Sequence, residues 1–142
     1  MNQNKYVLAL DVGDRRIGVA LASQLARLPA PLVTLDRTKI TEIYDNIDQL
    51  VRNQNVAVVV VGLPRGLHGQ ETQQTIIARK FAADLSHKLN IPVVMQDEAG
   101  TSIEAERLLK ARGKSYEKAD IDSEAASLIL RDYLNQTAGY TA

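Results

Sequence analysis

The order of apolar and polar positions along the chain predicts β-structure at its start. Two apolar runs, about Tyr6–Val12 and Ile17–Ala22, flank the sequence GDRR, in which Gly13 and Asp14 suit the tight turn of a β-hairpin. A third, short strand is predicted at Leu32–Asp36, after a segment that prolines interrupt.

The middle of the chain alternates helical and strand patterns. Apolar residues between Ile40 and Val51 recur at spacings of 3, 4, 7, 10 and 11, which predicts an amphipathic helix. The run VAVVVVGLP behind it has no polar alternation and predicts a strand buried on both faces, as in the middle of a parallel sheet. A second helix, about Thr72–Leu89, precedes the run IPVVMQ, which predicts another buried strand.

The last third of the chain reads as two helices. Thr101 and Glu104 have the T-x-x-E spacing of a capping box, which predicts a helix from Ser102 to about Arg112. A final helix is expected at about Ile121–Asn135. The order β-β-β-α-β-α-β-α-α predicts an α/β fold with a mixed five-stranded sheet flanked by helices. No repeat or linker interrupts it, so we expect a single domain over residues 1–142, with its core at about 5–135.

The composition narrows the chemistry. The chain has no cysteine and two histidines, so any metal would be held mainly by oxygen atoms, which favours magnesium or manganese. Its 17 basic and 17 acidic residues cancel, so a nucleic acid would have to bind to a local patch. No stretch approaches the roughly 20 apolar residues of a membrane span, and no signal peptide is evident, so we expect a cytoplasmic protein without a membrane partner.

Four acidic residues stand where the apolar pattern predicts burial. Asp11 ends the first strand, Asp97 and Glu98 follow the last strand, and Asp122 opens the last helix, ahead of a pair of alanines. If the first and last strands are neighbours, these carboxylates converge at one end of the sheet. Crowded carboxylates repel each other and are costly to desolvate, and a divalent cation removes both penalties and supports phosphodiester hydrolysis. Each acid alone also fits a plainer role in a turn, a loop or the first turn of a helix.

Basic residues near these acids are candidates for nucleic-acid contacts. Arg15 and Arg16 at the hairpin tip suit either a phosphate backbone or a solvated turn. Arg65 lies in the glycine-rich loop GLPRGLHG, at the carboxyl end of a buried strand, where α/β sheets commonly bind ligands. Lys118 belongs to a modest basic strip that also fits a plain helix surface. Aromatic residues are scarce, so a nucleic acid would be recognised by backbone shape and charge.

Four segments resemble the motifs of the YqgF family, also called RuvX. They are LALDVGDRRIGVA, VVVVGLPRGLHGQET, IPVVMQDEAGTSIEAERLL and DIDSEAASLILRDYL, in this order over about residues 5–134. The resemblance implies a ribonuclease H-like fold and a nuclease acting on structured RNA, with processing of the 5′ end of pre-16S rRNA as its task. A Holliday-junction-resolvase-like enzyme that acts on branched DNA is the second activity that it implies.

The resemblance also assigns residues. The D-x-G of the family's first strand falls on Asp11 and Gly13, its D-E on Asp97 and Glu98, and the aspartate of its C-terminal helix on Asp122. By this similarity Asp11, Glu98 and Asp122 would hold Mg²⁺ or Mn²⁺, and the catalytic set would be these three with Asp97. Asp97 and Glu98 point to opposite faces of a strand, so the strand pattern does not choose between them, and the resemblance favours Glu98.

The sequence departs from the family beside these acids. It reads DEAGTS where members usually read D-E-R-L-T-T, so that Ala99 and Gly100 replace an arginine and a leucine, and the segment KSYEKAD adds Glu117 and Asp120. Both changes weaken phosphate binding. A second hypothesis is therefore a non-catalytic ribonuclease H-like module that docks on nucleic acid or protein. We expect a monomer or a weak homodimer.

Overall fold

The computed structural model describes residues 4–138 and contains the predicted elements in the predicted order. They are β1 (Tyr6–Val12), β2 (Arg16–Ser23), β3 (Ala30–Asp36), α1 (Ile43–Asn53), β4 (Val56–Pro64), α2 (Gln73–Lys88), β5 (Val93–Glu98), α3 (Thr101–Ala111) and α4 (Lys118–Ala138). Residues 1–3 and 139–142 of the predicted domain lie outside the described residues. No helix within residues 4–138 is long and apolar enough to cross a membrane.

The five strands form one mixed sheet in the order β3-β2-β1-β4-β5. β1, β2 and β3 pair antiparallel, and β4 runs parallel to both β1 and β5. The predicted tight turn joins β1 to β2, where the Gly13 N–H donates to the Arg16 carbonyl at 2.9 Å. In the middle of β4, Val59, Val60 and Val61 have no exposed surface, which confirms a strand buried on both faces.

Two expectations about the last strand are wrong. β4 lies between β1 and β5, so the first and last strands are not neighbours. β5 is also an edge strand, and its Met95 side chain is exposed, so IPVVMQ is not a buried strand. The unbroken apolar run of β5 led to the expectation of burial. Such a run does not reveal whether a strand has one neighbouring strand or two, and in the described part of the chain β5 has only β4.

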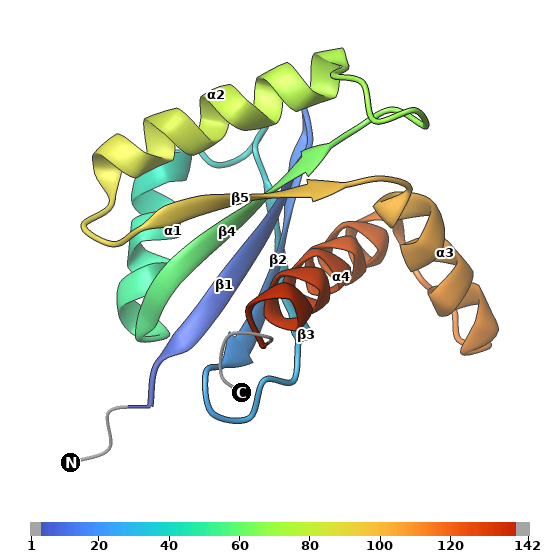
Figure 1. Cartoon of the computed structure of the whole chain (residues 1–142), viewed down its shortest axis with the longest axis horizontal. Helices are drawn as coiled ribbons and strands as arrows, with labels where there is room; N and C mark the ends of the chain where they lie inside the picture. Colours follow the sequence, from blue (N-terminus) through green and yellow to red (C-terminus); the bar gives the residue numbers. More distant parts are fainter. Residues whose placement is uncertain (1–3, 139–142) are drawn as a thin grey trace.

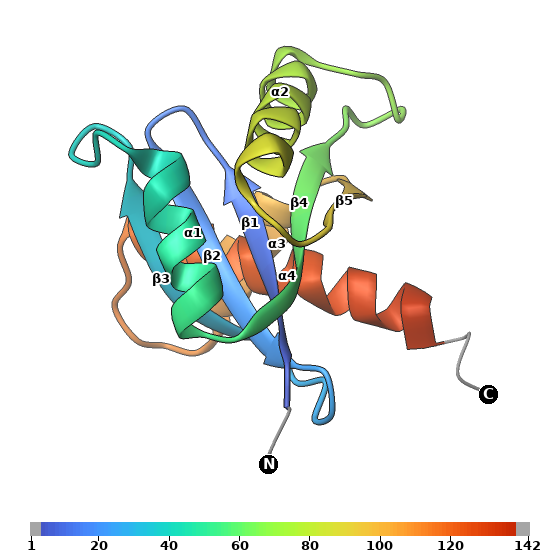
Figure 2. The same ribbon diagram turned by 90° about the vertical axis from the view of Figure 1, so that its left-hand side faces the viewer.

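Helices cover the sheet on both faces (Figures 1 and 2). α1 and α2 pack on one face over the large side chains of a core that includes Leu8, Leu10, Ile17 and Phe81. α4 crosses the other face, over a core built largely on small residues such as Ala9 and Ala20, and α3 packs against α4. The side chains of β1 contribute alternately to these two cores, because successive side chains of a strand point to opposite faces of the sheet.

The small residues let α4 lie unusually close to the sheet. A β-carbon on Gly18 of β2 would lie 1.9 Å from the backbone carbonyl oxygen of Asp122, and one on Gly62 of β4 would lie 2.4 Å from Ile129 Cδ1. On the helix itself, Ala125 and Ala126 have no exposed surface. Because any side chain at Gly18 would collide with backbone, this contact fixes the position of Asp122 over the sheet.

Some helix boundaries differ from the sequence prediction. α1 begins at Ile43 instead of Ile40, because the chain first makes a turn after Asp36. In this turn the Asp36 side chain accepts a hydrogen bond from the Thr38 N–H, and the Asp36 carbonyl accepts one from the Ile40 N–H. α4 begins at Lys118, so Asp122 lies in the second turn of this helix and does not open it. The apolar spacing marks the buried part of a helix, and α4 extends beyond it by an exposed polar turn.

Candidate active site

Asp11 is a carboxylate that faces the α4 side of the sheet near the end of β1. It shares that face with Val7 and Ala9, as the alternation of the strand requires. Within residues 4–138 its carboxylate receives no hydrogen bond and forms no ion pair. Burial, together with the nearby negative charge of Asp122, raises its pKa to about 7. Asp11 is therefore an acid that the fold desolvates without compensating.

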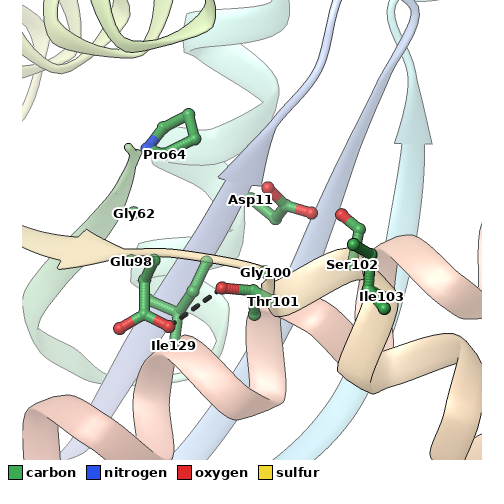
Figure 3. A pocket seen from close by; sticks show the side chains of 9 residues that line it. All are labelled: Asp11, Gly62, Pro64, Glu98, Gly100, Thr101, Ser102, Ile103 and Ile129. Atoms are coloured by element: carbon green, nitrogen blue, oxygen red, sulfur yellow. Dashed lines mark hydrogen bonds between the residues drawn. The ribbon is translucent and has the colours of Figure 1, made fainter. Parts of the chain in front are cut away.

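Glu98, the last residue of β5, faces the same region from the other side of β4. Burial, a hydrogen bond with the Asp132 carboxyl group and the negative charge of Asp132 raise the pKa of Glu98 to about 8. The Thr101 hydroxyl donates to Glu98 Oε1 at 3.0 Å, drawn as a dashed line in Figure 3. Both acids thus have a raised pKa mainly because they are buried.

The predicted capping box at the start of α3 is wrong, and the reason is this contact. α3 begins at Thr101 itself, after Gly100 in a left-handed conformation, and no side chain caps its amides. The Thr101 hydroxyl bonds to Glu98 instead of to a backbone N–H of the helix. Sequence spacing describes a local interaction and could not anticipate a competing acceptor at the end of β5.

The two acids line one pocket of about 200 Å³, shown in Figure 3. The pocket is also lined by Gly62, Pro64, Gly100, Thr101, Ser102, Ile103 and Ile129. In Figure 3 Asp11 lies across from Ser102, in the first turn of α3, and Glu98 lies beside Ile129. The first N–H groups of a helix have no acceptor within the helix, so the start of α3 brings backbone donors to a pocket that also holds two carboxylates.

Asp97 points away from this pocket. Its side chain is 67% exposed and accepts hydrogen bonds from Arg65, with Arg65 Nη2 at 3.0 Å from Asp97 Oδ1. The strand pattern left the choice between Asp97 and Glu98 open, and in the structure Glu98 lines the same pocket as Asp11. Which of the two acts as a ligand stays a prediction.

Asp122 lies near Asp11 but its side chain is engaged elsewhere. Arg16 Nε donates to Asp122 Oδ2 at 2.5 Å, in an ion pair between two partly buried side chains. Among the residues that the structure describes, no three acidic or histidine side chains lie close enough together to hold one metal ion. The three carboxylates of the predicted metal site therefore do not converge. Asp11 and Glu98 line one pocket, and Asp122 is paired with Arg16.

The pocket nevertheless suits a hard divalent cation. Asp11 and Glu98 offer carboxylate oxygens, the ligands that magnesium and manganese prefer, and both are held in a partly desolvated position where negative charge is costly. A bound cation would relieve that cost, so the donor set fits the predicted cofactor.

The four predicted nucleic-acid contacts differ in their surroundings. Arg15 and Lys118 have exposed side chains, at the β1–β2 hairpin and at the start of α4. Arg16 is paired with Asp122, and Arg65 forms ion pairs with both Asp97 and Glu71. Two of the four guanidinium or ammonium groups are thus already neutralised by acids of the same chain.

Sequence reasoning missed two residues of α4. Asp132 lies against Glu98, and a signal for it existed, because it stands three residues after Ile129 and so lies on a neighbouring part of the helix surface. Glu124 is buried, with 7% of its side chain exposed, and receives hydrogen bonds from Arg112 at 3.0 and 3.1 Å. Nothing in the sequence distinguished Glu124 from the other acids of this segment.

Comparison with known proteins gives one consistent result. Residues 5–136 match the family model described as "RuvX: Holliday junction resolvase". Proteins named "Putative pre-16S rRNA nuclease" match over most of their length: one from Chloroflexus aurantiacus is 43% identical over 93% of this chain and 88% of its own, and one from Synechocystis is 37% identical over 95% and 90%. The fold is similar to that of Thermus thermophilus RuvC in complex with a Holliday junction, with a TM-score of 0.58 and 14% identity over 94% of this chain and 96% of that one.

Proposed function

This chain belongs to the RuvX family, and we propose that it is a metal-dependent nuclease that hydrolyses phosphodiester bonds in structured nucleic acid. One observation carries the proposal: Asp11 and Glu98, two carboxylates with raised pKa values, line a single pocket into which α3 directs its first turn. A fold that only needed stability would pair such acids with basic residues or expose them to water.

The residues of the pocket have separate tasks in the proposed reaction. A divalent cation held by Asp11 and Glu98 would activate the attacking water and stabilise charge on the leaving oxygen. Thr101 fixes Glu98 Oε1 through its hydroxyl, and the backbone N–H groups in the first turn of α3 would bind oxygens of the substrate phosphate. Asp122 would complete the ligand set, with Asp97 at its rim.

The relatives suggest the substrate. Since they are named for pre-16S rRNA, we propose processing of the 5′ end of pre-16S rRNA in ribosome biogenesis, and the family description keeps branched DNA as the alternative substrate. Arg15 and Lys118, whose side chains are exposed, would contact phosphates of either nucleic acid. A cytoplasmic location and a monomeric or weakly dimeric state complete the proposal.

Two ion pairs favour a non-catalytic docking module as the second candidate. The first, between Arg16 and Asp122, occupies a proposed metal ligand, and the second, between Arg112 and Glu124, shows that α4 also uses acids for structure alone. Such a module would bind structured nucleic acid without cutting it.

The deciding experiment titrates Mg²⁺ and Mn²⁺ while cleavage of a pre-16S rRNA fragment and of a four-way DNA junction is followed. A nuclease should cut only with metal, and Asp11→Asn and Glu98→Gln should each lower the rate by at least about a hundredfold. Asp84→Asn, which removes a half-exposed acid of α2 on the other face of the sheet, is the matched control and should cut normally. Tight binding without cleavage at any metal concentration would support the docking module instead.

A further inference from the structure

The ion pair between Arg16 and Asp122 joins two parts of the chain that are 106 residues apart. Arg16 is the first residue of β2, at the hairpin that follows Asp11, and Asp122 lies on α4. Their side chains are 35% and 20% exposed, so the pair sits at the edge of the core and can be reached from solvent.

Asp122 cannot leave this region, because its backbone is fixed. Its carbonyl oxygen lies directly over Gly18, with no space for a β-carbon between them. Gly18 is in turn the register partner of Asp11 on the neighbouring strand. The negative charge of Asp122 is close enough to raise the pKa of Asp11. The Asp122 carboxylate therefore lies between two sites, the guanidinium of Arg16 on one side and the buried acid Asp11 on the other.

Arg16 also borders a separate hollow between the β1–β2 hairpin and the end of β3. This hollow has a volume of about 240 Å³ and is lined by Arg15, Arg16, Asp36 and Thr38. Asp36 accepts hydrogen bonds from Thr38 and its charge is paired with Lys39, so the two arginine side chains are the donors available to a ligand there. A guanidinium can bind a phosphate group through two parallel hydrogen bonds, as it can a carboxylate.

We propose that Arg16 is a positioning residue. Its guanidinium holds the Asp122 side chain away from Asp11 until a phosphate of the nucleic-acid backbone binds the guanidinium in place of Asp122. The freed Asp122 then joins Asp11 and Glu98 around the cation. This inference rests on the proposed function. It explains why three acids that the sequence places together are not gathered in the protein alone.

The proposal makes metal and nucleic acid bind cooperatively. Phosphate binding at Arg16 releases a metal ligand, and by linkage metal binding must strengthen nucleic-acid binding by the same factor. The closed ion pair also keeps a full set of acids from holding a cation when no substrate is present.

The test measures Mn²⁺ affinity by calorimetry, without nucleic acid, for wild type, Arg16→Gln and a control variant. Arg16→Gln frees Asp122 and should bind Mn²⁺ about tenfold more tightly than wild type, within the usual range of such couplings. Arg52→Gln is the matched control, because the exposed Arg52 forms an ion pair with Asp48 on α1, on the other face of the sheet. It should leave Mn²⁺ affinity unchanged, which separates the loss of the ion pair from a general loss of positive charge.

A second arm adds an RNA hairpin with phosphorothioate linkages, which resist hydrolysis. The hairpin should tighten Mn²⁺ binding about tenfold in wild type and Arg52→Gln, and less than about threefold in Arg16→Gln. If Arg16→Gln fails to fold, as its melting curve in chelator would show, Arg16→Lys carries the test. Lysine keeps the charge but lacks the Nε–H that binds Asp122, so Arg16→Lys should give an intermediate Mn²⁺ affinity.

Asp11→Asn separates failure of the inference from failure of the proposed function. If Asp11→Asn abolishes Mn²⁺ binding but Arg16→Gln binds Mn²⁺ no more tightly than wild type, the metal site stands and the role of Arg16 is refuted. If Asp11→Asn binds Mn²⁺ as wild type does, the site itself is wrong, and the role proposed for Arg16 is wrong with it.

Discussion

One buried and one half-buried carboxylate of this protein have opposite surroundings. Glu124 on α4 receives two hydrogen bonds from Arg112, at 3.0 and 3.1 Å, and is fully compensated. Asp11 on β1 receives none within the described residues, and burial raises its pKa to about 7. The chain supplies an arginine to one acid and leaves the other facing the pocket, and the proposed metal site rests on this contrast.

The largest expected effect breaks the compensated pair. Arg112→Ala leaves the Glu124 carboxylate buried without a partner, which should cost about 3 to 4 kcal/mol of the free energy of unfolding. Denaturant unfolding at pH 7 measures it. The double variant Arg112→Ala/Glu124→Gln removes the buried charge as well and should recover at least half of the loss. A loss under about 1 kcal/mol in Arg112→Ala would mean that Glu124 is hydrated and that the two acids do not differ as proposed.

The second prediction removes the uncompensated charge. Folded Asp11 keeps its proton up to about pH 7, whereas in the unfolded chain it ionises near its ordinary value of 3.8. The folded state then binds more protons, so without metal this residue costs stability as pH rises from about 4 to above 7. Asp11→Asn should match wild type near pH 4 and exceed it by about 3 kcal/mol at pH 8.

Melting in chelator across this pH range tests the second prediction. Glu98 also has a raised pKa and contributes a slope of the same sign, so only the difference between Asp11→Asn and wild type isolates Asp11. A difference that stays constant with pH would show that Asp11 ionises normally in the folded protein.

The sequence predicted the kinds of elements well because their signals are local. Spacings of three and four residues and unbroken apolar runs reflect burial on one or two faces, and these hold for α1, α2 and β4. The order of strands is not local: nothing in IPVVMQ shows that β4 separates β5 from β1 and leaves β5 at an edge. That order depends on how the crossing helices pack.

In the candidate site, too, the local features were predicted and the contacts between distant segments were not. Alternation along β1 indicated that Asp11 faces the side of Val7 and Ala9, and the structure confirms this orientation. The contact between Arg16 and Asp122, the hydrogen bond from Thr101 to Glu98 and the position of Asp132 each depend on packing between distant segments. Residue spacing carries no information about such contacts, so the pairing of one predicted ligand with one predicted phosphate contact was not foreseen.

The third prediction concerns the effect of Mg²⁺, the partner proposed for Asp11, on stability. At pH 8, Mg²⁺ at ten times its dissociation constant should stabilise the wild type by about 1.4 kcal/mol, because it binds only the folded chain. The melting temperature should rise by about 3 to 6 °C relative to chelator. Arg112→Ala should show the same rise, since its defect lies elsewhere, and Asp11→Asn should show none. An equal rise in Asp11→Asn would place the metal away from this pocket.

The smallest expected effect concerns the rim of the pocket. Ala99 is exposed, directly follows Glu98 and borders a surface hollow together with Arg65, Asp97 and Leu67. Ala99→Arg restores the arginine that the family resemblance expects and could form a two-point contact with a substrate phosphate. The neighbouring carboxylate of Asp97 competes for the new guanidinium, so we expect a gain of about 1 kcal/mol in nucleic-acid binding, roughly fivefold, at low salt.

Binding titrations at two salt concentrations, with cleavage followed in parallel, measure this gain. Because the contact is ionic, the gain should shrink as salt rises. Faster cleavage alongside tighter binding would mean that the uncompensated pocket is a working nuclease site whose rim has been weakened. Tighter binding without cleavage would favour the docking module, in which Asp11 is left without a partner for a reason other than catalysis. An affinity that is unchanged at both salt concentrations would show that Ala99 does not face the substrate, so the phosphate would approach Asp11 from the hairpin side, where Arg16 lies.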